Sequence, residues 1–260
     1  MAAGVVELAH RRSGSGPPAV ILHGLLGSGR NWQGIATALG AKFDVVLPDL
    51  RNHGGSPWDA EAGYSALVAD VLALLDRLGL ARVRLVGHSM GGKVAMALAL
   101  TAPDRVERLV VVDIAPVAYG PGLDELLAAM RALDLGRMTR RAEADAALSA
   151  AVPDRSVRAF LVQNLEQRPE GLAWRVNLDV LLPAMPVIRG FPEMPVVRPF
   201  AGPTCFIHGE RSDYVRPEHE PAIRQLFPAA ELHTVAGAGH WVHAERTEAF
   251  LAALLPCLEW

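Results

Sequence analysis

Short apolar runs alternate with amphipathic stretches along this chain. Runs bounded by glycine, proline or polar residues are typical of buried strands, and apolar residues at spacings of three and four are typical of crossover helices. The predicted strands are residues 19–22, 43–48, 83–87, 109–113, 204–208 and 232–235, and the predicted helices are 64–78, 91–101, 217–226 and 247–258. This repeated strand–helix order predicts an α/β fold with a doubly wound, mostly parallel sheet.

Residues 117–202 interrupt that order and are called the lid segment below. They show helical patterning without a convincing strand, with helical stretches at 123–133, 140–150 and 155–165, and prolines cluster from position 183 onward. We expect a helical insertion that folds over the carboxyl ends of the strands, where open α/β proteins bind ligands. Residues 1–116 and 203–260 then form the core domain.

Several side chains of the lid segment have two possible roles. Arg175 either meets an acidic group of a substrate or pairs with a carboxylate at the surface. The larger apolar side chains either line a substrate pocket or pack in the core. These are Phe160, Leu161, Trp174, Leu181 and Met185.

Composition excludes several classes of function. The 260 residues are 51% hydrophobic, enough for one sizeable core, and the net charge of −3 provides no basic field for nucleic acid. No secretory signal and no run of ~18 uninterrupted apolar residues is present, so we expect neither export nor a membrane span. Cys205 and Cys257 match neither a disulfide framework nor a metal spacing, which predicts packing residues in the reducing cytoplasm.

The strongest chemical motif is Gly87-His88-Ser89-Met90-Gly91. It lies between a predicted strand and a predicted helix, which is the context of a G-x-S-x-G nucleophile elbow. The flanking glycines allow a sharp turn that projects the hydroxyl above the sheet. The alternative role for Ser89, a simple helix cap, needs no such glycines. Ser89 is therefore the candidate nucleophile.

A serine hydroxyl needs a neighbouring base, and a late histidine is the candidate. His240 follows the last predicted strand on the glycine-rich run 236–239, at the same end of the sheet as Ser89. The chain order of serine, acid and histidine is that of α/β-hydrolases. His243 is better suited to packing.

The acid of the predicted triad has two candidates. Asp213 follows the penultimate strand, but it stands one place beyond the usual position three residues after Gly209, which Ser212 occupies. Asp113 closes an apolar strand, where an ionised carboxylate needs a strong partner such as an imidazolium. We favour Asp113, with Asp213 as the alternative and Ser212 as a helper that donates a hydrogen bond.

An oxyanion intermediate requires backbone donors near the nucleophile. We expect the N–H groups of Met90, directly after the nucleophile, and Leu25, on the loop after the first predicted strand. The glycines of that loop follow the order G-x-x-G-x-G without a carboxylate for a ribose, which argues against a dinucleotide site. We expect no cofactor and no metal.

Together these residues resemble the α/β-hydrolase superfamily over nearly the whole chain. The closer resemblance is to small acyl-ester hydrolases shared by bacteria and mitochondria. The motifs that carry it are Asp49–Pro57, Gly87–Lys93, Asp113–Pro116, Trp174–Leu178 and Gly237–Glu245. The resemblance implies an α/β-hydrolase fold, an acid in the Asp113–Pro116 segment, and activity on short to medium acyl esters, with thioesters also in range.

The sequence thus predicts a serine esterase that forms an acyl-enzyme on Ser89 and acts on a small-molecule ester. The same triad also serves carbon–carbon bond hydrolases, lyases and perhydrolases, and a non-catalytic binding protein of this fold is a further alternative. The aspartate nucleophile of dehalogenases and epoxide hydrolases is not present at Ser89. Oligomeric state, acyl chain length and the choice between ester and thioester are left open by the sequence.

Overall fold

A seven-stranded sheet forms the centre of the protein in the computed structural model, which describes residues 4–192 and 198–259. The strand order is β1-β3-β2-β4-β5-β8-β9, with β1 antiparallel to β3 and the other pairs parallel. The strands are β1 (His10–Gly14), β2 (Pro18–Leu22), β3 (Asp44–Pro48), β4 (Val83–His88), β5 (Val106–Val112), β8 (Thr204–Gly209) and β9 (Ala230–Val235). This is the doubly wound sheet that the sequence predicts.

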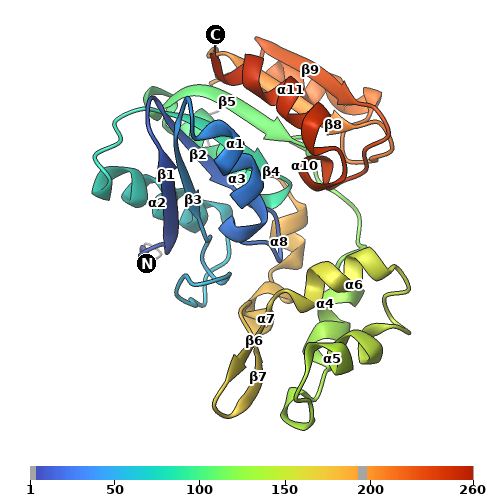
Figure 1. The fold of residues 1–260 in the computed structure, drawn as a ribbon. Coiled ribbons are helices and arrows are strands. Elements are labelled where there is room, and N and C mark those ends of the chain that lie inside the picture. The colour runs from blue at the N-terminus through green and yellow to red at the C-terminus, as the bar shows by residue number, and fades with distance from the viewer. Residues whose placement is uncertain (1–3, 193–197, 260) are drawn as a thin grey trace.

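Helices cover both faces of the sheet because each central strand is apolar on both sides. In β2, Ala19 and Ile21 pack toward the helices α1 (Gln33–Leu39) and α11 (Thr247–Glu259). The alternate residues Val20 and Leu22 belong to the core under the other face, with α2 (Tyr64–Arg77), α3 (Met90–Thr101) and α9 (Glu220–Leu226). Figure 1 shows these two helical layers. Continuous apolar runs are the signature of such doubly covered parallel strands.

The predicted strands and crossover helices are confirmed, with boundaries shifted by a few residues. Two elements of the core escaped the sequence pattern. Strand β1 is exposed and polar because it lies at the sheet edge, so it shows no apolar run. Helix α1 has seven residues and only three buried side chains, too few for a clear period.

The regular elements of the lid segment are mainly helices, as expected, and the segment lies as a lobe to one side of the sheet (Figure 1). Its helices are α4 (Asp124–Arg131), α5 (Arg141–Leu148), α6 (Arg155–Val162), α7 (Leu178–Leu181) and α8 (Met185–Arg189). Residues 193–197 of the predicted insertion lie outside the described residues.

The expectation that the lid segment contains no strand is wrong. Strands β6 (Leu165–Arg168) and β7 (Gly171–Trp174) form an antiparallel hairpin. Their burial is partial and charged residues occupy β6, so no apolar run marks them. Gly171 supplies a positive φ of 128° at the turn, which other residues rarely adopt.

Cys205 and Cys257 are buried in the core as predicted, but the expectation that they form no disulfide is wrong. Cys205 in β8 and Cys257 in α11 form a disulfide across 52 residues of sequence. Spacing alone does not show such a pair, because it depends on α11 packing against β8. The two sulfurs and His233 form a compact group of possible metal ligands, but the disulfide leaves neither sulfur as a free thiolate. The two cysteines therefore give no support to a reducing compartment.

Further short elements lie between the longer helices and strands of the core and of the lid segment. They are the 3-10 turns η1 (Gly29–Trp32), η2 (Pro103–Arg105), η3 (Leu135–Arg137) and η4 (Pro217–His219), and the helix α10 (Val242–Glu245). Among the helices in the described ranges, none combines the length and the apolar character needed to cross a membrane.

Candidate active site

Ser89 occupies a strained turn between β4 and α3. Its backbone angles are φ 53° and ψ −120°, a conformation that residues with a side chain rarely adopt. The flanking glycines permit the close packing around it. A Cβ on Gly87 would lie 2.2 Å from the carbonyl oxygen of Gly91, and one on Gly91 would lie 2.4 Å from that of His23. The structure therefore has the elbow geometry that the glycine spacing predicts.

His240 lies within hydrogen-bond distance of both Ser89 and Asp113. Its Nε2 is 3.1 Å from the Ser89 Oγ, and its Nδ1 is 2.7 Å from the Asp113 Oδ2. In the tautomer that suits both contacts, the Ser89 hydroxyl donates to Nε2 and Nδ1–H donates to the carboxylate. His240 is more than 100 residues away in the chain from both Ser89 and Asp113, and the strand ends bring the three side chains together.

The carboxylate of Asp113 is buried and completely surrounded by donors. It directly follows β5, with a φ of 52°, and is 0% exposed. Its Oδ1 accepts from the Gly209 N–H at 2.9 Å, and its Oδ2 accepts from both the Ser212 hydroxyl and His240. These three donors hold the carboxylate in a fixed orientation.

Asp213 has a different position. It is exposed and lines a cavity beside Ser89, whereas the Nδ1 of His240 faces Asp113. Ser212 contacts the carboxylate that the sequence assigned it to help. The structure thus brings together Ser89, His240, Asp113 and Ser212, and it places Asp213 at the rim.

Two further residues hold His240 in place, one at its imidazole and one at its backbone, and sequence reasoning gave them no role. The ring of Tyr214 stacks on the imidazole with ring centres 4.0 Å apart. On another side, the Nε2–H of His88 donates to the carbonyl oxygen of His240 at 2.9 Å. Burial lowers the pKa of His88 well below its ordinary value, which keeps it neutral. Tyr214 stands two residues after Ser212, and that position was the only available signal.

The two residues predicted to supply the oxyanion donors both lie beside Ser89 in the wall of one cavity. Met90 is the first residue of α3, so its N–H has no partner inside the helix. Leu25 and Met90 both line a cavity with Ser89. The loop that carries Leu25 is fixed at the next residue, because the N–H of Leu26 donates to the Nε2 of His53 at 3.1 Å.

Neutral histidines support this loop. His23 donates from Nδ1 to the Gly24 carbonyl oxygen, and its Nε2 accepts from the Leu50 N–H at 2.9 Å. Burial lowers the pKa of His53 to about 3. A protonated ring at His53 would lose its ability to accept from Leu26, so the loop depends on the neutral form. These contacts give His23 a structural role in the loop.

Two mainly apolar cavities meet at Ser89. One has a volume of about 440 Å³ and includes Lys93, Met185 and Asp213 in its wall. The other has a volume of about 270 Å³ and includes His240 and Phe160. Of the lid residues with two possible roles, Phe160, Leu161 and Met185 line these cavities, while Trp174 and Leu181 pack into apolar clusters.

Polar contacts attach the lid segment to the core beside the site. Asn177 donates from its side chain to the Asn52 Oδ1 at 3.0 Å, and its backbone N–H donates to the Asn52 carbonyl at 2.9 Å. Asn164 donates to the carbonyl oxygen of Leu26 at 2.8 Å. Because these side-chain amides are buried, the loss of their hydrogen bonds costs free energy of unfolding. No sequence pattern marks them, since asparagine pairs across more than 100 residues leave no periodic signal.

Lys93 provides a third attachment. Its ammonium donates to the carbonyl oxygen of Arg189 at 2.7 Å and to that of Gly190, and it lies 4.8 Å from the ring centre of Tyr119. Burial lowers the pKa of Lys93 to about 7. The Lys93 side chain therefore attaches the end of α8, in the lid segment, to α3 of the core.

Comparisons with known proteins agree with this geometry. The family model described as the alpha/beta hydrolase fold matches residues 17–247. The mouse sn-1-specific diacylglycerol lipase ABHD11 is 44% identical over 92% of this chain and 80% of its own length, and the Escherichia coli esterase YbfF is 37% identical over 91% of each. A marine microorganism esterase of known structure superposes with a TM-score of 0.94, at 36% identity, over 97% of this chain and 100% of its own.

Proposed function

The chain belongs to the alpha/beta-hydrolase family and is an ester hydrolase, and from that premise we propose that it cleaves short to medium acyl esters and thioesters through an acyl-enzyme on Ser89. The observation that carries the proposal is the pair of contacts of His240, 3.1 Å to Ser89 and 2.7 Å to Asp113. A serine beside a base that is itself oriented by a carboxylate is the arrangement of nucleophilic acyl transfer.

In the first step, the Ser89 Oγ attacks the ester carbonyl carbon while Nε2 of His240 takes the hydroxyl proton. The carbonyl oxygen becomes an oxyanion, and the N–H groups of Leu25 and Met90 donate to it. Asp113 stabilises the imidazolium that forms, because its carboxylate is already oriented toward Nδ1 by Ser212 and the Gly209 N–H.

In the second step, the carbon–oxygen or carbon–sulfur bond of the ester breaks and the imidazolium returns its proton to the leaving alcohol or thiol. Water then attacks the acyl-enzyme with His240 again acting as the base, and the carboxylic acid leaves while Ser89 regains its proton. No redox partner is required for this sequence.

The proton transfer assigns the two cavities to the two halves of the substrate. The leaving oxygen must lie next to His240, and the 270 Å³ cavity includes His240 in its wall, whereas the 440 Å³ cavity does not. We therefore place the alcohol or thiol half in the 270 Å³ cavity and the acyl chain in the 440 Å³ cavity. The apolar lining of the larger cavity, including Met185, suits an alkyl chain.

We also propose that residues 117–202 act as a lid over a core formed by residues 1–116 and 203–260. The contacts of Asn164 and Asn177 with the core and the contribution of Phe160 to the cavity support that role. The cytoplasmic location stays a prediction, and its original basis in two unpaired thiols does not survive the disulfide.

A substrate panel with a covalent probe tests the proposed function. We expect the protein to hydrolyse p-nitrophenyl acetate, butyrate and octanoate, and to be labelled by a fluorophosphonate at Ser89. The variant Ser89→Ala loses the labelling and retains only the residual rate due to binding and the oxyanion donors. Ser156→Ala, at an exposed position of α6, is the matched control and keeps both properties.

Two results would overturn the proposal. Full ester turnover by Ser89→Ala would exclude Ser89 as the nucleophile. Absence of any fluorophosphonate adduct in the folded wild-type protein would favour a binding module, and cleavage of carbon–carbon bonds in place of esters would favour the alternative reactions of the same triad.

A further inference from the structure

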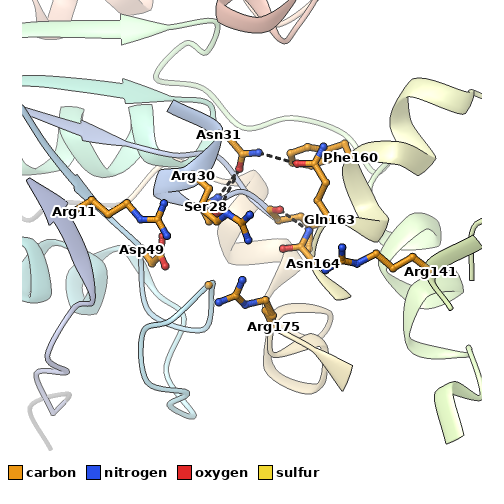
Figure 2. A pocket seen from close by; sticks show the side chains of 12 residues that line it. Arg11, Ser28, Arg30, Asn31, Asp49, Arg141, Phe160, Gln163, Asn164 and Arg175 are labelled. Atoms are coloured by element: carbon orange, nitrogen blue, oxygen red, sulfur yellow. Dashed lines mark hydrogen bonds between the residues drawn. The ribbon is translucent and has the colours of Figure 1, made fainter. Parts of the chain in front are cut away.

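A polar cavity of about 260 Å³ lies between the core and the lid segment (Figure 2). Four arginines reach it from four different elements. Arg11 in β1 and Arg30 in η1 come from the core, while Arg141 in α5 and Arg175, directly after β7, come from the lid segment. Figure 2 shows their guanidinium groups turned toward a common space. A ligand in this cavity would contact both parts of the protein.

The charge of this arginine cavity is poorly balanced by the protein itself. Among the described residues, Arg175 is the one arginine of these four that forms an ion pair, with its Nε 3.2 Å from the Glu166 carboxylate. Arg141 donates to a neutral group, the carbonyl oxygen of Leu165. Arg11 and Arg30 have no carboxylate within ion-pair distance among the residues that the structure describes. Like charges gathered in one space favour an anionic ligand.

The one carboxylate in the wall is already engaged. Asp49 accepts from the N–H of Gly29 at 2.7 Å with one oxygen and from the N–H of Gly55 at 2.8 Å with the other. It therefore holds two loops of the core in place rather than pairing with a neighbouring arginine. The net charge of the arginine cavity remains positive.

The arginine cavity adjoins the 270 Å³ cavity that we assign to the alcohol or thiol half of the substrate. Leu26, Asn31 and Phe160 line both it and the 270 Å³ cavity that includes His240 and Ser89. Above this shared wall, Asn31 donates to the Gln163 Oε1 at 3.2 Å, which joins the core to the lid segment. Figure 2 shows Phe160 beside this amide pair. A substrate can thus extend from the nucleophile past Phe160 to the arginines.

A phosphate group matches these donors better than a carboxylate. Each guanidinium presents a planar fork that binds two oxygens, and four forks offer more donors than one carboxylate can use. A phosphate monoester carries about −1.5 to −2 charges and three acceptor oxygens. The arrangement from four directions also suits its tetrahedral shape.

We propose that the arginine cavity is a subsite for a phosphate group on the alcohol or thiol half of the substrate. The proposal rests on the proposed ester hydrolysis and names its substrate class, an acyl ester whose leaving group is phosphorylated. The acyl chain occupies the 440 Å³ cavity, the leaving oxygen lies at His240, and the phosphate lies among the arginines.

A matched pair of soluble substrates tests this subsite. The two compounds are 1-butyrylglycerol and 1-butyrylglycerol 3-phosphate, which share the ester and differ only in the phosphate. We expect the wild-type kcat/KM to be about 10- to 100-fold higher for the phosphorylated ester at low salt, the range for hydrogen bonds to charged groups. The double variant Arg30→Gln, Arg141→Gln brings the ratio of the two kcat/KM values close to one.

The control variant is Arg137→Gln. Arg137 is a highly exposed residue of the lid segment, pairs with Asp134, and lies outside the walls of the arginine cavity. It keeps the wild-type ratio. Titration of Ser89→Ala protein with glycerol 3-phosphate, followed by calorimetry, provides a readout without catalysis, and the heat of binding disappears in the double arginine variant.

Different results overturn different statements. A wild-type ratio near one, with both esters hydrolysed, excludes the phosphate subsite and leaves the esterase function intact. No hydrolysis of either ester by folded protein overturns the proposed function itself. A preference that Arg30→Gln, Arg141→Gln leaves unchanged would place the phosphate elsewhere.

The phosphate can belong to a soluble ester or to a lipid surface, and a last measurement separates these sources. We expect no co-sedimentation with vesicles of phosphatidic acid and phosphatidylcholine above that with phosphatidylcholine alone. Co-sedimentation that depends on the arginines, combined with no preference between the two soluble esters, would replace the substrate subsite by a membrane-docking surface and overturn the proposal.

Discussion

The carboxyl-terminal edge of the sheet, where its parallel strands end, and the lid segment contribute to the same site by different physical means. At the sheet edge, each reactive group is fixed by buried hydrogen bonds, as Asp113 is by Gly209, Ser212 and His240. The lid segment contributes mainly apolar walls such as Phe160, with polar contacts at its points of attachment to the core. In the proposed mechanism, the edge is therefore rigid where bonds change, and the lid segment shapes what can enter.

This difference separates chemistry from selectivity. Acyl transfer needs donors and acceptors positioned within tenths of an ångström, which strand ends in a packed sheet provide. Selectivity between substrates requires cavity walls and charges, which an insertion can change without disturbing the sheet. Substitutions at the edge should then lower turnover for every ester, while those in the lid segment should change the ratio between esters.

The largest expected effect is at the acid of the sheet edge. Asp113→Asn lowers kcat for p-nitrophenyl butyrate by about 10⁴-fold, because the amide no longer holds His240 in the tautomer that accepts the Ser89 proton. Asp213→Asn, at the exposed rim, is the matched control and changes kcat little. A greater loss in Asp213→Asn would reverse the assignment of the acid.

Acid pH should destabilise the core before it affects the lid segment, which contains no histidine. Burial lowers the pKa of His53 and of His243 to about 3, below the ordinary value of 6.5. Between pH 3 and pH 6.5 these two histidines bind protons in the unfolded chain but not in the folded protein. The free energy of unfolding is therefore at its full value above about pH 6.5 and falls as the pH drops toward 3. Each histidine contributes roughly 1.4 kcal/mol per pH unit in this window.

Chemical denaturation at a series of pH values measures this slope. The variant His243→Phe keeps a ring on Trp32, on which the imidazole stacks at 4.0 Å, and removes one titrating group. We expect its slope to be shallower by the equivalent of one proton. An unchanged slope would show that His243 is protonated in the folded protein.

A smaller effect is expected at the attachment of the lid segment. Asn177→Ala leaves the Asn52 side chain without one buried partner and costs about 1–3 kcal/mol locally. Hydrogen exchange should then rise in α7 and neighbouring parts of the lid segment and stay unchanged in the central strands. Gln167→Ala, on the exposed strand β6, serves as the control. Equal protection loss in β4 and β5 would mean that core and lid segment unfold as one unit.

The smallest effect concerns acyl chain length. Met185 is buried in the wall of the 440 Å³ cavity, so Met185→Phe reduces the space for the acyl chain. We expect the ratio of kcat/KM for octanoate to that for acetate to fall about 10-fold, the range for a few methylenes in an apolar pocket. Phe160→Ala, in the wall on the alcohol side, should leave this ratio unchanged. A change of the ratio in Phe160→Ala alone would reverse the assignment of the acyl and alcohol halves to the two cavities.

The local sequence predicts the elements that carry the nucleophile. The apolar run of β4, the glycines around Ser89 and the apolar helix α3 are all consecutive in the chain. Backbone conformation at a glycine and the period of apolar residues are short-range properties, so one sequence reveals them. The exposed strand β1 and the charged hairpin β6–β7 lack that signal, because neither buries a continuous apolar run.

The sequence by itself determined the order of strands and helices, the turn at Ser89 and the candidate residues at the strand ends. Only the tertiary structure decided which carboxylate faces His240, which cysteines pair and which arginines share a cavity. Asp113 and His240 are 127 residues apart, and they meet because β5, which precedes Asp113, and β9, which precedes His240, both lie beside β8 in the sheet. The lid segment separates β5 from β8 in the chain. Such contacts depend on how elements pack in space, and no short-range preference of the backbone encodes them.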